Sequence, residues 1–377
     1  MDSGGVRRLF GVAGIGAIAG VVVACGGNGG SPSSSGGSAS VPNVSVSSFD
    51  SSFSAMSQFS GLTSAGKGIV GVILPDTTSS TRYVDFDAPY LAKAFQMAGY
   101  SSSQYKIDNA QGSDATELAD AQSDITLGAS VIVFDPLDST VGSQIQTYAQ
   151  QHGVVAISYD RATFTGTNTY YVSFDNVQVG KLIGQGFVDC ISSWNISSPQ
   201  VFELDGGEDT DPNAVSFAQG YNSVIWGTTN SPLSAGTTNS KGYTLVGDQV
   251  APGWDNTKGG QIFQQQLTAH SNINATVEAN DGLANAVIGI LKSSNVQPKT
   301  IPTTGQDATL QGMEWILQNY QCGSVYKAVY KEAQAAVALA TILRAGQQPP
   351  SSLVNGTTKP PANVSGNQQP AVLLTPV

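Results

Sequence analysis

Short, uninterrupted apolar runs alternate with longer stretches of helical spacing along this chain. The run GIVGVILP at 68–75 is followed by a helical pattern in DAPYLAKAFQMAGY, and YKIDNA is followed by another in DATELADAQSDITLGA. The alternation continues through VIVFDP, STVGSQIQTYAQQHG and VVAISYD. The apolar runs are continuous, as in strands that helices cover on both faces, so the pattern predicts an α/β fold with a parallel sheet.

The same rhythm restarts after YYVSFDN at 170–176. The predicted elements are a helix from Val177 to about Ser192, PQVFELDGG, a helix around PNAVSFAQGYNSVIW, TLVGDQV, a helix from about Asp255 to Ala269, INATVEAND, a helix from Leu283 to Ser293, TIPTTGQDA, the helix TLQGMEWILQNY and SVYK. A further long helix, YKEAQAAVALATILRAG, precedes a Pro- and Gly-rich tail. The pattern therefore predicts two similar, Rossmann-like α/β units.

The amino terminus has the layout of an export signal. Arg7 and Arg8 precede the uncharged run LFGVAGIGAIAGVVVA, and the end of that run followed by Cys25, VVAC, resembles the bacterial lipobox. We expect residues 1–24 to be a lipoprotein signal peptide and Cys25 to be lipidated, which would anchor the exported protein to the outer face of the cytoplasmic membrane. A buried cysteine in an ordinary anchor helix is the alternative. Residues 25–62 are rich in Gly and Ser and predict a flexible tether.

Composition removes several classes of function. The formal net charge is −11 and only 11% of residues are charged, and the 16 Lys and Arg form no basic stripe, so we expect no nucleic-acid partner. The chain has two histidines, His152 and His270, which excludes a His-rich metal centre and disfavours a Ser-His-Asp site. We therefore predict no metal and no cofactor.

Two cysteines remain after the predicted signal, Cys190 and Cys322. An exported protein with an even pair can join them in a disulfide. The sequence does not place them within bonding distance, so two buried thiols remain the alternative.

Polar residues follow most of the predicted strands. In open parallel sheets ligands bind beyond the carboxyl ends of strands, which makes these positions candidates for a binding site. They are Asp135, Tyr159-Asp160-Arg161, Asp175-Asn176, Asp205, Asp248-Gln249, Asn280-Asp281 and Gln306-Asp307. Helix caps or turn formers are the alternative for each, and we favour that alternative for Asp175 and Asp281.

Seven strings in the same order resemble the periplasmic sugar-binding receptors of ABC importers, and among them the D-xylose-binding type. They are ISYDR at 157–161, YVSFDNVQVG at 171–180, DPNA at 211–214, VGDQ with Trp254, AND at 279–281, GQDA at 305–308 and SVYK at 324–327. The resemblance implies the type I periplasmic binding fold, with two lobes joined by a three-stranded hinge. It implies a first lobe of 63–174 plus 328–369 and a second lobe of 175–327 plus 370–377.

The chemistry of sugar recognition fits these residues. Each buried sugar hydroxyl needs hydrogen-bond partners, which carboxylates, amides, Arg and Lys supply, and an aromatic face covers the C–H bonds. An arginine can donate a planar fork of N–H bonds to adjacent sugar oxygens. By resemblance, the sugar site comprises Arg82, Tyr83, Asp160, Arg161, Asn213, Trp254, Asn280, Asp307 and Lys327.

Alternatives remain for individual residues. Arg82 lies in the loop DTTSSTRY and could be a solvated charge, Trp254 could staple a helix start, and Lys331 competes with Lys327. The xylose type generally has tryptophan where this chain has Tyr83, and Pro302 interrupts the strand before GQDA. These departures bear on which sugar binds more than on the class of ligand.

The predicted function is a receptor, most simply a monomer, that binds D-xylose or a related pentose or aldose and delivers it to an ABC permease. A sugar or signal-molecule sensor and a nucleoside receptor are alternatives within the same fold. A glycoside-cleaving enzyme is disfavoured, because we expect the acids Glu203, Asp205, Glu208, Asp209 and Asp211 to share one solvated loop. The same acids lack the spacing of a calcium loop.

Overall fold

A computed structural model describes residues 40–208, 211–361 and 364–377. The predicted signal peptide, Cys25 and the first part of the predicted tether lie outside the described residues. Within the described part of the chain, no helix combines the length and the apolarity needed to cross a membrane.

The first lobe is built on a seven-stranded sheet with the order β2-β1-β3-β4-β5-β10-β9. Its strands are parallel except β9, which runs antiparallel to β10. The bounds are β1 (Ile69–Leu74), β2 (Tyr105–Asn109), β3 (Ala129–Phe134), β4 (Val155–Tyr159), β5 (Thr169–Phe174), β9 (Gly356–Thr358) and β10 (Gln369–Leu374). The prediction of a parallel sheet is confirmed.

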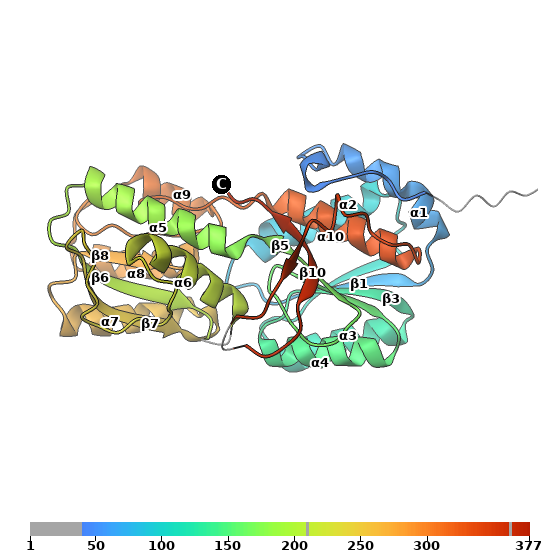
Figure 1. Ribbon diagram of the computed structural model, residues 1–377, viewed down its shortest axis with the longest axis horizontal. Coiled ribbons are helices and arrows are strands. Elements are labelled where there is room, and N and C mark those ends of the chain that lie inside the picture. The colour runs from blue at the N-terminus through green and yellow to red at the C-terminus, as the bar shows by residue number, and fades with distance from the viewer. Residues whose placement is uncertain (1–39, 209–210, 362–363) are drawn as a thin grey trace, which may run out of the picture. The chain divides into compact units, whose positions relative to one another are not determined.

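Helices cover both faces of this sheet. The helices are α1 (Ser60–Ala65), α2 (Ala88–Met97), α3 (Asp114–Thr126), α4 (Ser139–Gln151) and α10 (Val329–Arg344). Figure 1 shows α2 and α10 on one side of the sheet and α3 and α4 on the other. Successive residues of β3 therefore enter different cores: Val131 and Val133 pack with α2 and α10, and Ile132 and Phe134 pack with α3 and α4.

The second lobe has a three-stranded parallel sheet with the order β7-β6-β8. Its elements are β6 (Gln200–Gly206), β7 (Thr244–Ala251), β8 (Ala275–Glu278), α5 (Asn176–Ser193), α6 (Pro212–Ile225), α7 (Asn256–Ala269), α8 (Asp281–Ser293) and α9 (Leu310–Leu317). Helices α5 and α6 can approach closely because Gly180 and Gly220 have no side chain. A Cβ at Gly180 would meet the Phe217 carbonyl, and one at Gly220 would meet the Val177 carbonyl.

The two strands predicted at 300–308 and 324–327 do not form as regular strands. The segments pair only through isolated bridges, Thr303 with Gln321 and Gln306 with Val325. Pro302 lacks the backbone N–H that a central strand needs, and the backbone of Asp307 is left-handed (φ 93°). These features replace the expected strand with an irregular one.

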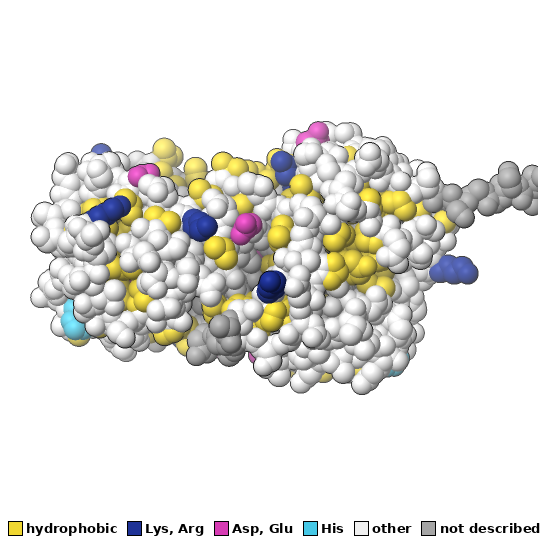
Figure 2. Space-filling view, viewed as in Figure 1, with side chains coloured by type: hydrophobic (Ala, Val, Ile, Leu, Met, Phe, Trp, Pro, Cys, Tyr) yellow, Lys and Arg dark blue, Asp and Glu magenta, His cyan; other side chains and the backbone are white. Residues whose placement is uncertain are grey.

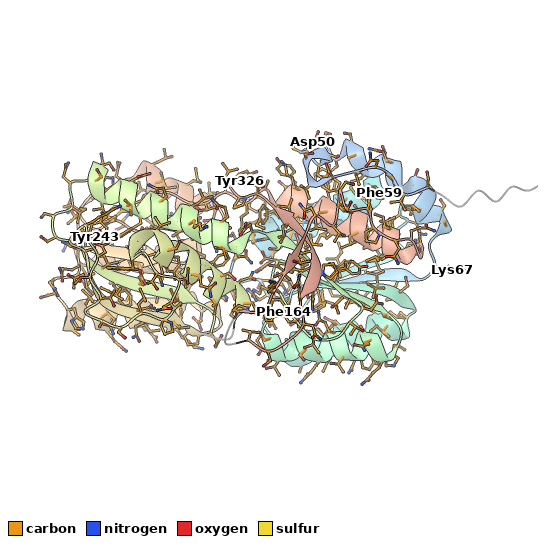
Figure 3. All side chains as sticks on the ribbon, viewed as in Figure 1. Asp50, Phe59, Lys67, Phe164, Tyr243 and Tyr326 are labelled. Carbon is orange, nitrogen blue, oxygen red and sulfur yellow. A yellow bond between two sulfur atoms is a disulfide. The ribbon has the colours of Figure 1, made fainter. Side chains whose placement is uncertain are left out.

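The chain passes between the lobes after β5, returns before α10, and approaches the second lobe again at its carboxyl end. We expected residues 370–377 in the second lobe. Strand pairing instead places β10 beside β5 in the first sheet, and only Val377 exchanges backbone hydrogen bonds with Tyr326. Figure 3 shows Tyr326 near the end of the chain.

The predicted tether is too long at its carboxyl end. Val44, Phe49, Phe53, Met56 and Phe59 are buried in the same core as α2 and α10. Because these five apolar side chains leave water on the first lobe, residues 44–62 are part of the folded body.

Cys190 of α5 is bonded to Cys322, which follows the bridge segment at Gln321, and their Cα atoms are 5.8 Å apart. The bond links a helix of the second lobe to its irregular edge. On the face shown in Figure 2, basic and acidic side chains are scattered singly rather than gathered in a stripe.

Candidate functional site

The nine residues expected at the sugar site all line one cavity. They come from turns and strand ends of both lobes, together with Ser79, Ser80, Phe217 and Gln306. The cavity is about 30 Å³, room for little more than water. Since pockets for small ligands are roughly 300 Å³ or more, the described conformation is closed around this set of polar groups.

Arg82 is the centre of the first-lobe side of the site. It lies at the start of a single π-helical turn, Tyr83–Asp87, and is 1% exposed, so it is not a solvated loop charge. Its Nη1 donates to Asp160 Oδ1 at 2.9 Å, and its remaining nitrogens bind carboxylates behind the cavity. The loop DTTSSTRY therefore places a fully buried cation at the cavity wall.

Asp160 carries its charge inside the protein. Burial opposes the ionised form, but Arg82, Lys327 and Arg161 outweigh that cost and lower the pKa of Asp160 to about 2. The hydroxyl of Tyr83 also donates to its Oδ2 at 3.1 Å. Asp160 is thus an ionised acceptor at every physiological pH.

Arg161 and Arg82 both contact the ring of Tyr83. Each guanidinium carbon is 5.5 Å from the centre of that ring, a cation–π distance. Arg161 also donates to the Pro136 carbonyl and the Ser79 hydroxyl at 3.3 Å. These contacts connect both arginines and the tyrosine along the cavity wall.

Asn213 connects the two lobes. It is in the first turn of α6, which Asp211 caps, and its Nδ2 donates to the backbone carbonyl of Asp160 at 2.8 Å. Tyr171 of β5 donates to the same carbonyl at 2.8 Å. Asn213 thus links the second lobe to the end of β4 in the first lobe through a hydrogen bond.

Trp254 is buried at 6% exposure at the end of a short turn after β7. Its indole Nε1 donates to Asp211 Oδ2 at 2.7 Å, and its ring meets Phe217 edge-on with centroids 6.2 Å apart. The indole is therefore held at the cavity wall and is not only a staple for α7.

Asp307 and Lys327 form a buried ion pair at 2.8 Å. Ser80 of the first lobe donates to Asp307 Oδ2 at 3.3 Å, which adds another contact between lobes. Lys331, the alternative to Lys327, does not line the cavity, and its charge instead acts on Asp50.

Asn280 both lines the cavity and caps α8, because its side chain accepts from the Leu283 N–H at 2.8 Å. Asp175 caps α5 as expected. Asp281 does not cap its own helix. It is buried and accepts from the backbone and hydroxyl of Thr309, which holds the start of α9.

Three residues of the site have left-handed backbones. The φ angles are 55° at Asp160, 58° at Trp254 and 93° at Asp307. Such conformations cost about 1–3 kcal/mol each for residues other than glycine and gather at ligand sites. Three such residues therefore lie at strand or turn ends around this one cavity.

A larger outer cleft of about 790 Å³ leads to the cavity and shares Ser79, Arg161 and Trp254 with it. Arg161 is the basic residue among those that line it, and the acids are Asp76, Asp114, Asp138, Glu208, Asp211 and Asp255. This excess of acidic side chains disfavours an anionic ligand in the outer cleft.

The expectation that five acids share one solvated loop is wrong for two of them. Glu203 and Asp205 are buried on β6, next to Asp248 of β7, whereas Glu208 and Asp211 line the outer cleft and Asp209 lies outside the described residues. Over residues 40–208, 211–361 and 364–377, no group of three or more His, Cys, Asp or Glu could hold a metal ion.

Sequence reasoning missed several residues at or behind the cavity. Ser79, Ser80 and Phe217 line it, and Asp87 and Glu332 hold Arg82 from behind. A buried arginine requires opposite charges nearby, which is a general signal, but the sequence does not show which acids supply them.

Comparison with known proteins places this geometry in a family. The model of the periplasmic binding protein domain matches residues 70–348. A D-xylose-binding periplasmic protein of Escherichia coli is 31% identical over 72% of this chain and 76% of its own length. The multiple sugar-binding receptor ChvE of Rhizobium radiobacter is 29% identical over 76% of this chain and 80% of its own.

A solved structure is also similar to this chain. A carbohydrate transporter solute-binding protein from Chloroflexus aurantiacus, in complex with D-glucose, superposes with a TM-score of 0.68 at 25% identity and covers 82% of this chain and 92% of that one. Two α/β lobes around one polar cavity define a periplasmic binding protein of type I. The chain belongs to the periplasmic binding protein family, in its sugar-binding branch near the D-xylose-binding proteins.

Proposed function

We propose that this protein is an extracytoplasmic receptor that binds a monosaccharide, D-xylose or a related pentose or aldose, and delivers it to an ABC importer. The observation that carries the proposal is the convergence of nine polar and aromatic residues from both lobes on one cavity. The relatives named above, whose names and titles state binding of D-xylose, multiple sugars or D-glucose, support it.

The chemistry of the cavity suits a neutral polyol. Asp160 and Asp307 accept from hydroxyls, Asn213 and Asn280 can also bind them, and Lys327 donates. Trp254 offers an aromatic surface to C–H bonds. The cations lie beside carboxylates, so an anionic ligand would find little net positive charge.

Binding couples to closure of the lobes. Contacts such as Asn213 to Asp160 and Ser80 to Asp307 exist only when the strand ends of both lobes face each other. A sugar that bonds to both lobes favours this closed form, and a permease would recognise it. We assign the first lobe to 63–174 and 328–369 plus the N-terminal segment from 44 and strand β10, and the second to 175–327.

Lipid attachment at Cys25 would hold the receptor at the outer face of the cytoplasmic membrane. The layout of Arg7, Arg8, an uncharged run and VVAC supports this. Mass spectrometry of the membrane fraction should find acylated Cys25, and Cys25→Ser should release the protein. An unmodified Cys25 in the mature chain would rule the anchor out.

Calorimetry with free pentoses and hexoses tests the proposal. We expect saturable binding of one or a few neutral sugars without turnover, by a monomer. Trp254→Ala should weaken that binding by roughly 2 kcal/mol, about thirtyfold, because a stacking anchor is lost. Trp194→Ala, outside the cavity at the residue that follows α5, is the matched control and should bind as the parent does. Absence of binding to every sugar in the panel would refute the proposal.

A further inference from the structure

The guanidinium of Arg82 is bound by two carboxylates besides that of Asp160. Asp87 receives Nε at 2.9 Å and Nη2 at 2.8 Å, as a two-point fork. Glu332 of α10 receives Nη2 at 2.7 Å. Both acids are fully buried, and neither lines the cavity.

The donors of Arg82 can be counted. A guanidinium group has five N–H bonds: one on Nε, two on Nη1 and two on Nη2. Asp87 and Glu332 take three of them, and Asp160 takes one from Nη1 at 2.9 Å. One Nη1–H is left, and it has no partner among the described residues.

Asp87 and Glu332 are themselves held in place by two different elements of the first lobe. The hydroxyl of Tyr159 on β4 donates to Asp87, and α10 carries Glu332 in its first turn. The sheet and the last long helix of the first lobe thus fix the plane of the guanidinium. Rotating the guanidinium to present two N–H bonds to a ligand would leave a buried carboxylate without its partner, which is strongly unfavourable.

We propose that Asp87 and Glu332 are positioning residues that restrict Arg82 to a single free N–H for the bound sugar. This rests on the function proposed above, and for Arg82 it replaces the general expectation that an arginine donates a planar fork to adjacent oxygens. Arg82 instead donates to one sugar oxygen, while Asp160, fixed by the same guanidinium, accepts from a hydroxyl.

A double-mutant cycle tests whether Asp87 acts through Arg82. Calorimetry with the sugar that the parent binds most tightly should show at least a tenfold loss of affinity for Asp87→Asn, because the amide N–H₂ cannot accept from Nε or Nη2. In an Arg82→Lys background, the same change should alter affinity less than twofold. Asp85→Asn, an exposed acid of the same turn, is the control and should leave affinity unchanged.

Glu332 supplies a second test that a purely structural role would not pass. Glu332→Gln keeps an oxygen that accepts from Nη2 and should bind within threefold of the parent, whereas Glu332→Ala should lose at least tenfold. Circular dichroism of each variant verifies folding, and the Glu332 pair decides the matter if Asp87→Asn does not fold.

These experiments distinguish a failure of the proposed receptor function from a failure of the positioning role. If the parent binds no sugar, the proposed function itself is wrong. If the parent binds, but Asp87→Asn weakens affinity equally in both backgrounds, or Glu332→Ala and Glu332→Gln behave alike, the positioning role is wrong and the receptor function stands.

Discussion

Gly206 leaves the space of its missing side chain to the indole ring of Trp254. It ends β6 in the second-lobe sheet, and a Cβ built there would overlap the six-membered ring of the indole. Trp254 in turn is held by Asp211 and faces the cavity. The strand end and the aromatic wall of the site are therefore fitted to each other.

Gly206→Ala should displace the indole and damage the site. Overpacking of this kind costs about 1–3 kcal/mol, and we expect a lower melting temperature together with at least a tenfold loss of sugar affinity. Thermal unfolding and calorimetry measure the two effects.

Gly186→Ala is the matched control. Gly186 lies inside α5 with no atom within 4 Å of the added Cβ, so alanine should raise stability by up to about 1 kcal/mol through helix propensity. Unchanged affinity in the Gly206 variant would mean that the indole does not contact the sugar.

Stability should fall as pH rises, because Glu203 and Asp248 are buried on the second-lobe sheet and form no ion pair with a cation of the described residues. Burial, together with the nearby Asp248 charge, raises the pKa of Glu203 to about 8 from 4.5, and burial raises the pKa of Asp248 to about 6. The groups that meet them are Asp205, the Trp226 indole N–H and the backbone N–H of Leu233.

The direction in which stability changes with pH follows from proton linkage. An acid whose pKa is higher in the folded state contributes most stability below its unfolded pKa, near 4.5 for Glu203, and that contribution is lost as pH rises to about 8. Urea unfolding between pH 4.5 and 8.5 should show the decline, and Glu203→Gln should make it shallower by up to about 1.4 kcal/mol per pH unit.

The exposed Glu314 provides the control, since Glu314→Gln should leave the slope as in the parent. A Glu203→Gln curve with the parent's slope would show that Glu203 is ionised in the folded protein at neutral pH.

Loss of the Cys190–Cys322 disulfide should lower stability without abolishing sugar binding. The two cysteines are 132 residues apart in sequence, and neither lines the cavity. Removing a link over so long a loop typically costs about 2–5 kcal/mol. Cys190→Ser with Cys322→Ser should therefore melt earlier than the parent and bind sugar with similar affinity.

Reductant gives an independent measurement, since it should lower the melting temperature of the parent and leave the double variant unchanged. Equal melting temperatures of parent and double variant would contradict a stabilising role for the bond.

Most elements could be predicted from periodicity, because helices and buried strands impose different spacings on apolar residues. The runs that became β1, β3 and β4 are examples. The irregular segment at 300–308 was predicted as a strand, but Pro302 lacks a backbone N–H and the backbone at Asp307 is left-handed, and both break the hydrogen-bonded ladder. The packing of Phe49 and Phe53 on the first lobe was missed because Ser and Gly dominate the surrounding composition.

The sequence by itself determined the alternation of strands and helices and the residue types at strand ends, since both depend on local spacing and side-chain chemistry. Only the tertiary structure decided which acids meet Arg82, that Glu203 and Asp248 are partners on neighbouring strands, and that β10 joins the first sheet. These are contacts between segments far apart in the chain, and they depend on how helices and sheets pack, which no local pattern records.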